Sequence, residues 1–229
     1  MLLSQLQQEL SQIIEEAQIK LLDIQILVYA SFYEFNDKHK TFMQIQSIFM
    51  IFTIWECFIK TSFKKFIEML NLNMSGIPLS KFKDSLIIYH MESVLPQLKE
   101  YPKNLKNKSE YFDNFQKQFN QSKIYSYKLM IGKSNIDFNV LNQILEIFCL
   151  NKIEPYWKKY QDNKSSGECL DELIKIRHAI AHGTSVENKD YTEDFNMHKN
   201  VVLDLMYEIH QRIIECFEKK DYLKEEFRV

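Results

Sequence analysis

Residues 168–183 have the sequence ECLDELIKIRHAIAHG, and their apolar positions repeat with the period of an α-helix. Steps of three and four residues are the spacing of a helix face that packs against a core. The positions are Leu170, Leu173, Ile174, Ile176, Ile180 and Ala181. Gly183 follows, and glycine often ends a helix because it tolerates left-handed backbone angles. The segment therefore predicts one amphipathic helix that ends at Gly183.

The last turn of this predicted helix contains Arg177, His178 and His182. Arg177 and His182 lie about 140° apart around a helix, so they do not stack but both can line one cleft at its end. Arginine is a permanent cation whose donors fit phosphate oxygens, and histidine exchanges protons near neutral pH. The pair fits metal-independent RNA cleavage, in which His182 moves a proton and Arg177 stabilises charge on the phosphate. The carbonyl dipoles at the helix end favour a cationic imidazole, which helps His182 to act as an acid.

Two other interpretations of these residues involve no RNA. Arginine is rare here, since the chain has 29 Lys+Arg and only three of them are arginines. A salt bridge from Arg177 to Asp171 or Glu172 would explain this arginine without chemistry, and residue types alone favour it. A zinc site is a further alternative, because His178 and His182 share a helix face. The glutamate of an H-E-x-x-H motif is absent, however, and no clear third ligand follows.

The hexapeptide R-H-A-I-A-H, Arg177–His182, resembles the R-polar-x-x-x-H motif of the HEPN superfamily, with His178 in the polar position. Together with Gly183 it is similar to the RN-x-IAHG form of the RiboL-PSP branch of that superfamily. The segment WECFIK at residues 55–60 is similar to the second-helix pattern of the same branch.

This resemblance implies an all-α antiparallel helical bundle, usually a homodimer whose paired motifs form one metal-independent endoribonuclease site. It assigns Arg177 and His182 as catalytic and His178 as a supporting polar residue, with RNA as substrate and no cofactor. It also suggests a toxin or anti-phage effector, with an antitoxin or defence-system protein as a partner. HEPN toxins that a nucleotidyltransferase regulates have tyrosine two residues after the histidine, where this chain has Thr184.

Some HEPN-like domains are not enzymes, and this gives the alternative function. A non-catalytic helical module would bind a nucleotide or a partner protein through the same cleft. The intact motif favours the ribonuclease, because degenerate modules tend to lose it.

Length and composition predict a single domain over residues 1–229, with an insertion at 99–133. Hydrophobic residues make up 45% of the chain, and only four glycines and four prolines occur, which favours long helices. A formal net charge of -2 gives no overall attraction to nucleic acid, so RNA must bind through a local patch.

The cysteines and the longest apolar run indicate the cellular compartment of the protein. No cysteine pair has a metal-type C-x-x-C spacing, and the apolar context predicts four reduced core cysteines in a cytoplasmic protein. They are Cys57, Cys149, Cys169 and Cys216. The run Ile48–Trp55 is shorter than the roughly 20 residues that span a bilayer, and no signal segment opens the chain, so we expect no membrane.

Apolar periodicity also predicts the helices outside the motif. We expect a polar turn at 36–40 and a charged end at 223–229 that frays. The expected helices cover residues 2–34, 41–72, a segment capped by Ser80, a short one from Asp137 or Asn139, and 192–222.

Glu56 lies in the middle of the second expected helix, beside Trp55. A carboxylate in such an apolar setting is costly unless it is paired. Lys60, four residues on, can supply that pair. The functional alternative is a supporting role, in which Glu56 orients Arg177 or His182.

The expected insertion at 99–133 has eight lysines and three acidic residues, a local formal charge of +5, with aromatic residues interleaved. Lysines can follow an RNA backbone while aromatic rings stack on bases. The lysines that we expect to bind RNA are Lys103, Lys106, Lys108, Lys123 and Lys128. The alternative is a helix with a buried phenylalanine face and a solvated lysine face, followed by a loop.

Overall fold

The computed structural model describes residues 1–29, 35–73, 76–95, 101–120, 135–160, 163–182 and 191–228. These ranges contain seven α-helices and two 3-10 helices and no β-strand, which confirms the all-α prediction. The α-helices are α1 (Leu2–Tyr29), α2 (Asp37–Asn73), α3 (Asp84–Val94), α4 (Leu105–Phe119), α5 (Phe138–Ile147), α6 (Ser166–Ala181) and α7 (Thr192–Lys219). The 3-10 helices are η1 (Leu79–Lys81) and η4 (Glu225–Phe227).

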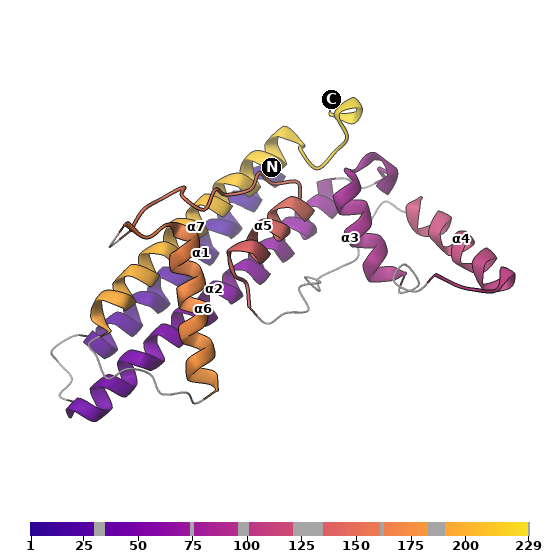
Figure 1. The fold of residues 1–229 in the computed structure, drawn as a ribbon. Coiled ribbons are helices and arrows are strands. Elements are labelled where there is room, and N and C mark those ends of the chain that lie inside the picture. The colour runs from indigo at the N-terminus through magenta and orange to yellow at the C-terminus, as the bar shows by residue number, and fades with distance from the viewer. Residues whose placement is uncertain are drawn as a thin grey trace.

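Three long helices, α1, α2 and α7, lie side by side and form the body of the molecule (Figure 1). Helix α1 runs antiparallel to α2, because Glu9 near its start pairs with Lys65 near the end of α2 at 3.3 Å. At the other end, the hydroxyl oxygens of Tyr29 and Ser47 lie 3.1 Å apart.

Helix α7 also runs antiparallel to α1. Lys199 donates to Gln25 at 2.8 Å, and Gln18 donates to Tyr207 at 2.7 Å, so the two sequences run in opposite directions along the contact. Since both α2 and α7 oppose α1, they run in the same direction as each other.

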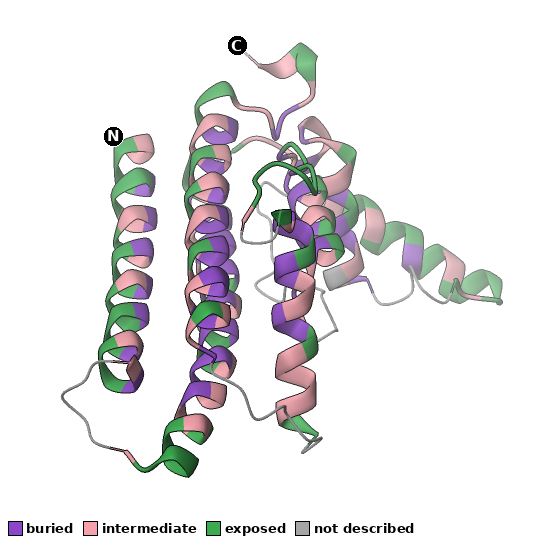
Figure 2. Cartoon of the chain, turned by 60° about the vertical axis from the view of Figure 1, so that its left-hand side comes forward, coloured by how far each residue is buried: buried purple, intermediate pink, exposed green. Residues whose placement is uncertain are grey.

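The core lies between these helices, and Figure 2 shows their buried faces turned inward. Each large apolar side chain that is fully buried contributes roughly 1.5–3 kcal/mol relative to an exposed one. Fully buried members include Trp55, Phe52, Phe63, Phe66, Phe148, Phe195, Leu6, Leu10 and Leu21. On α7, the buried positions include the apolar residues Val201, Val202, Leu205, Met206, Ile209, Ile213 and Phe217.

Helix α6 crosses this body and packs on α2 and α7, while α5 packs on α6 and α3 (Figure 1). Asp137 caps α5 by accepting from the Val140 amide at 2.7 Å, as the sequence predicted. Helix α4, within the expected insertion, contacts α3 and projects away from the long helices.

Two predicted helix starts are wrong. The polar turn expected at 36–40 is largely helical, because the Asn36 side chain accepts from the His39 amide at 2.9 Å and α2 begins at Asp37. Ser80 does not cap α3, which begins at Asp84. The Lys83 amide instead donates to the Tyr222 carbonyl at 2.9 Å, and Lys83 is extended at the N-cap.

The chain end up to Arg228 is packed, in contrast to the fraying that the sequence predicted. Leu223 is buried and forms an isolated β-bridge with Phe82. The Lys224 amide donates to the Lys81 carbonyl at 3.0 Å, and Arg228 pairs with Asp221 at 2.9 Å.

One stretch of α2 is long and apolar enough to cross a membrane by length and composition alone, with a mean hydropathy of 1.5. The expectation from the sequence rested on the run 48–55, which is interrupted only by Thr53, whereas this wider window tolerates more polar residues. Half of the window is buried inside the fold, and α2 contacts α1, α6 and α7.

All four cysteines are free. Cys169 and Cys216 are buried and Cys149 is partly buried. The prediction of a core position is wrong for Cys57, which is exposed on the side of α2 that faces α1.

Candidate active site

The N-terminus of α6 is fixed by a reciprocal pair of hydrogen bonds. The Ser165 hydroxyl accepts from the Glu168 amide at 3.2 Å, and the Glu168 carboxylate accepts from the Ser165 amide at 2.8 Å. This capping box satisfies two amides that the first turn of a helix leaves unpaired. The next residue, Ser166, donates through its hydroxyl to the Lys158 carbonyl at 3.0 Å. The start of the motif helix is therefore anchored to the preceding loop.

The C-terminal half of α6 emerges from the core. Leu170, Leu173 and Ile174 are buried, whereas the residues that follow are partly exposed and Ala181 is exposed (Figure 2). His182 is the C-cap, with its amide donating to the His178 carbonyl at 3.0 Å. Gly183 and Thr184 lie outside the described residues. The helix thus brings the last turn of the motif to the surface.

Arg177 lies on aromatic rings of α2. The carbon at the centre of its guanidinium is 5.2 Å from the centroid of the Phe52 ring and 5.9 Å from that of Phe49. Such cation–π contacts orient an arginine without neutralising it. Its Nε is buried and has no hydrogen-bond partner among the described residues.

The carboxylates that could have neutralised Arg177 are engaged elsewhere. Glu172 pairs with Lys164 at 2.7 Å, and Asp171 accepts from the Phe138 amide at 3.3 Å. Neither forms an ion pair with Arg177, so the structure does not contain the salt bridge that residue types alone favoured.

His178 is held from the side by Asn135, whose amide nitrogen hydrogen bonds to His178 Nε2. With the Asn135 amide in this orientation its nitrogen donates and Nε2 accepts, which corresponds to the Nδ1–H tautomer of a neutral imidazole. The ring of His182 stacks on that of His178, with centroids 6.0 Å apart and planes 4° from parallel. His182 is exposed. The motif therefore presents one anchored imidazole and one accessible imidazole.

Asn135 is a site residue that the sequence did not indicate. It precedes α5 and is 43 positions from His178 in the chain. Two contacts place it: the Trp55 indole donates to the Ile136 carbonyl at 3.0 Å, and the Phe138 amide donates to Asp171 at 3.3 Å. The segment 135–138 is thereby fixed to both α2 and α6. No sequence spacing signals such a contact, because it depends on how α5 packs.

Glu56 pairs with Lys60 at 3.5 Å, the helical pair that the sequence offered as the simpler alternative. Its Oε1 is buried and has no partner among the described residues. No contact joins Glu56 to Arg177 or His182 in that part of the chain. Glu56 lies one helical turn from Phe52, the ring beneath Arg177.

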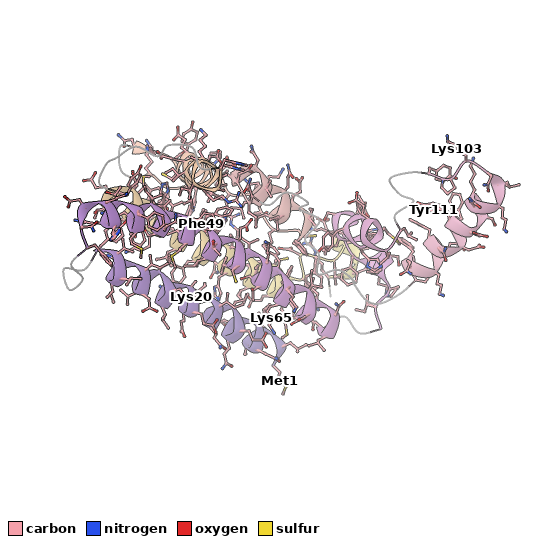
Figure 3. The ribbon with its side chains drawn as sticks, turned by 90° about the horizontal axis from the view of Figure 1, so that it is seen from below. Met1, Lys20, Phe49, Lys65, Lys103 and Tyr111 are labelled. Atoms are coloured by element: carbon pink, nitrogen blue, oxygen red, sulfur yellow. The ribbon has the colours of Figure 1, made fainter. Side chains whose placement is uncertain are left out.

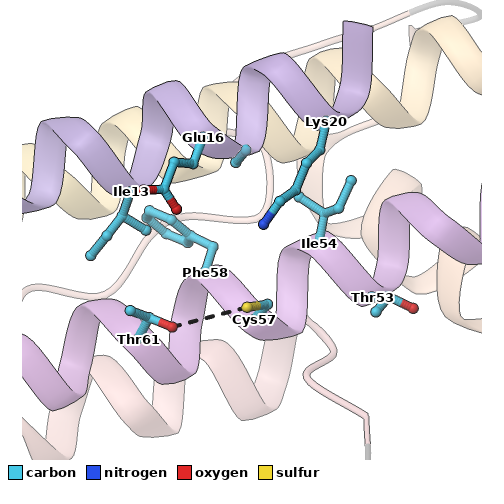
Figure 4. Close-up of a pocket in the computed structure, with 9 residues that line it drawn as sticks. Ile13, Glu16, Lys20, Thr53, Ile54, Cys57, Phe58 and Thr61 are labelled. Carbon is cyan, nitrogen blue, oxygen red and sulfur yellow. Dashed lines mark hydrogen bonds between the residues drawn. The ribbon is translucent and has the colours of Figure 1, made fainter. Parts of the chain in front are cut away.

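A groove lies between α1 and α2. One end, shown in Figure 4, has a volume of about 210 Å³, and its lining includes Lys20 and Cys57. It shares Lys20 with a second hollow of about 370 Å³ whose lining includes Phe49 and Met50. Phe49 thus borders the hollow and also contacts Arg177.

Of the lysines expected to bind RNA, the three that the structure describes lie away from the motif. Lys103 and Lys106 are exposed and Lys108 is partly buried, all at the N-terminal end of α4. Figure 3 places Lys103 at the far end of the molecule from Phe49. Lys123 and Lys128 lie outside the described residues.

The described residues contain no group of three His, Cys, Asp or Glu side chains gathered as a metal ion requires. His178 and His182 stack on each other, and His178 Nε2 is bonded to Asn135. This arrangement does not support the zinc alternative.

The structure is thus a helical body with a crossing helix, α6, that carries Arg177 and His182 towards its exposed end. The family model described as RiboL-PSP-HEPN matches residues 5–215, and the chain belongs to this family. A search of curated proteins and of solved structures returned no match to the chain. The family points to a ribonuclease or a nucleotide-binding helical module.

Proposed function

We propose that this protein is a metal-independent endoribonuclease, acting as a toxin or anti-phage effector, with its site at the C-terminal end of α6. The observation that carries the proposal is the state of Arg177. Its guanidinium is fixed by Phe49 and Phe52, yet it has no carboxylate partner among the described residues. A fixed and uncompensated cation at the mouth of a site suits an anion supplied from outside, such as a phosphodiester.

The reaction is an internal transesterification. A base removes the proton of the 2′-hydroxyl, whose oxygen then attacks phosphorus, and the bond to the 5′-oxygen breaks. An acid returns a proton to that oxygen, which leaves 2′,3′-cyclic phosphate and 5′-hydroxyl ends. Arg177 stabilises the charge on the phosphorus oxygens. His182, as the accessible imidazole, exchanges the protons. His178 is a positioning residue, because Asn135 and the His182 ring hold it on two sides.

The reaction needs a base and an acid, and each protomer offers one accessible motif imidazole. We therefore propose a homodimer in which two α6 ends face one groove, so that one His182 acts as base and the other as acid. The surface beside Phe49 supports this arrangement. Leu27 and Met50 are exposed there and line an apolar hollow that they share with Phe49, which contacts Arg177. A second copy that covered this surface would bury apolar area close to both sites.

An antitoxin or a defence-system protein is proposed as a further partner, because an unrestrained ribonuclease harms the cell that makes it. Glu56 is proposed as a supporting residue, since its buried oxygen lies one turn along α2 from Phe52.

The test is cleavage of RNA by purified protein in EDTA. We expect the wild type to cleave, and Arg177→Ala and His182→Ala each to lose a factor of about a hundred or more in rate. Arg212→Ala is the matched control, because Arg212 pairs with Glu208 on α7 and should be dispensable for cleavage. Cleavage that required added divalent metal, or that survived both motif substitutions, would contradict the proposal. A folded wild type that binds nucleotide without cleaving RNA would favour the non-catalytic module.

A further inference from the structure

Helix α4 exposes an aromatic surface that the rest of the described chain does not cover. Tyr101 and Phe112 are each 53% exposed, and Leu105 is 84% exposed. Tyr111 alone in this helix is buried, where α4 contacts α3. Phe115 and Phe119 pack against the core, so one face of α4 is partly buried. Tyr101, Leu105 and Phe112 stay outside that contact, and a cluster of exposed apolar side chains indicates a binding surface.

The rings on this surface are held in a defined arrangement. Tyr101, which precedes the helix, folds back so that its ring centroid lies 5.6 Å from that of Tyr111 and 6.5 Å from that of Phe112, edge to face. Lys108 Nζ lies 5.4 Å from the Tyr101 centroid and holds the ring from its other side. The half-exposed rings of Tyr101 and Phe112 are therefore ordered by their neighbours before any ligand arrives.

Charge beside Tyr101 is positive, whereas exposed carboxylates flank Phe112 in the sequence. Residues 101–109 include Lys103, Lys106 and Lys108 and no acidic residue, and the acidic residues of α4 follow at Glu110 and Asp113. Figure 3 shows Lys103 at the same end of the molecule as Tyr111. The exposed lysines thus lie in the same stretch as Tyr101 at the start of α4, and Phe112 follows about two helical turns further along.

We propose that Tyr101 and Phe112 form a stacking platform for unpaired bases of single-stranded RNA, with Lys103 and Lys106 contacting the phosphates. This inference rests on the proposed ribonuclease function and gives its substrate a second contact away from α6. Protein interfaces are depleted in lysine, whereas surfaces that bind single strands combine lysines with exposed rings. Bases in a duplex stack on each other and present no free face to these rings.

The test measures binding without cleavage. The probe is a fluorescein-labelled oligouridine of about twelve nucleotides, a length within the range that single-strand sites cover. All its sugars are 2′-O-methylated, so it lacks the nucleophile for transesterification. Fluorescence anisotropy in EDTA then gives affinity whether or not the protein is an active nuclease.

We expect Tyr101→Ala and Phe112→Ala each to weaken binding about fivefold or more, as loss of one stacked base predicts. Phe112→Tyr should keep the affinity and Phe112→Leu should lose it, because leucine is apolar but has no ring. Tyr156→Ala is the matched control, since Tyr156 is an exposed aromatic residue outside α4. The double variant Lys103→Gln/Lys106→Gln should reduce the slope of log affinity against log salt by about 1.4.

Three results would overturn the platform. The first is equal affinity of the wild type and Phe112→Leu for the probe. The second is binding of a blunt RNA duplex as tightly as the single strand. The third is a change from dimer to monomer on Phe112→Ala with no change in RNA binding, which would make α4 a contact between chains. Ring-dependent binding without any RNA cleavage would instead retain the platform and contradict only the ribonuclease.

Discussion

The guanidinium of Arg177 lies against the rings of Phe52 and Phe49, which leave its charge intact. A carboxylate in the same place would have made this arginine a helix-end salt bridge with no anion-binding capacity. Asp171 and Glu172 are close in sequence, but each is bonded to another group. Because aromatic rings and not a carboxylate hold Arg177 in place, its charge remains available to bind an anion.

Replacing Asn135 tests how the imidazole of His178 is positioned. Asn135→Ala removes the donor to His178 Nε2, so the His178 ring and the His182 ring stacked on it lose their fixed orientation. We expect a fall in cleavage rate of up to about a hundredfold, the cost of misplacing a reacting group by around an ångström. Nitrogen NMR of the imidazoles should show the Nδ1–H tautomer of His178 in the wild type and a mixture in the variant.

Asn139→Ala is the control for this experiment, because Asn139 is exposed on α5 four residues further along. A variant at Asn135 that kept full activity, with an unchanged His178 tautomer, would show that the hydrogen bond has no role in the site.

His198 gives a prediction about pH. Its ring on α7 is fully buried, and burial lowers its pKa to about 4, although Glu172 and Asp194 nearby act to raise it and Lys164 acts to lower it. Between about pH 4 and the ordinary histidine pKa of about 6.5, His198 is protonated in the unfolded chain but neutral in the folded chain. The free energy of unfolding should therefore fall by up to about 3 kcal/mol as pH drops from about 6.5 to about 4.

Urea unfolding at pH 7.5 and at pH 5 measures this loss. Burial also lowers the pKa of His90 and His210, so they add losses of the same sign. His198→Leu should reduce the difference between the two pH values, while His39→Leu, at an exposed position, should not. An equal pH dependence in the wild type and His198→Leu would exclude His198 as a cause.

At the scale of elements, the predictable features were those set by local sequence. The apolar period gave α1, α2, α6 and α7, and Asp137 was predicted among the possible starts of α5. The start of α3 was predicted wrongly because a distant contact decides it. Lys83 bonds to Tyr222 across the molecule, so α3 begins after it and not at Ser80.

The residues of the candidate site also fall into those that the sequence predicts and those that only the fold brings together. Arg177, His178 and His182 follow from one hexapeptide, because a single helix turn sets their spacing. Asn135 and the rings of Phe49 and Phe52 come from other elements, and only tertiary packing brings them to the motif. The insertion was predicted by composition, but which of its rings remain exposed depends on how α4 meets α3.

Replacing Ser165 and Ser80 in turn tests which of the two serines caps a helix. Ser165→Ala removes the capping box of α6 and should lower the free energy of unfolding by about 1 kcal/mol. Ser80→Ala removes the serine expected from sequence to cap α3, and should change stability by less than about 0.5 kcal/mol because it makes no such cap. Chemical denaturation of both variants supplies the comparison, and equal losses would contradict the assignment of the cap to Ser165.

In the proposed dimer, both chains contribute residues to one active site. Arg177→Ala and His182→Ala homodimers should both be inactive. A heterodimer of the two variants has one intact Arg177 and one intact His182 in its shared groove. It should be more active than either homodimer but less active than the wild type, because one of the two imidazoles is missing. Co-expression with two different affinity tags and tandem purification isolates this heterodimer for the cleavage assay. No recovery in a heterodimer of confirmed composition would indicate two separate sites.

A map of 5′-hydroxyl RNA ends in host cells that express the protein tests most directly whether the end of α6 is a ribonuclease site. The map works for any RNA substrate, because transesterification leaves a 5′-hydroxyl end at every cut. We predict new 5′-hydroxyl ends in cells with the wild type, and none above background in cells with equal amounts of folded Arg177→Ala or His182→Ala. The same ends in all three cultures, or new ends that carry a 5′-phosphate, would contradict a ribonuclease site at the end of α6.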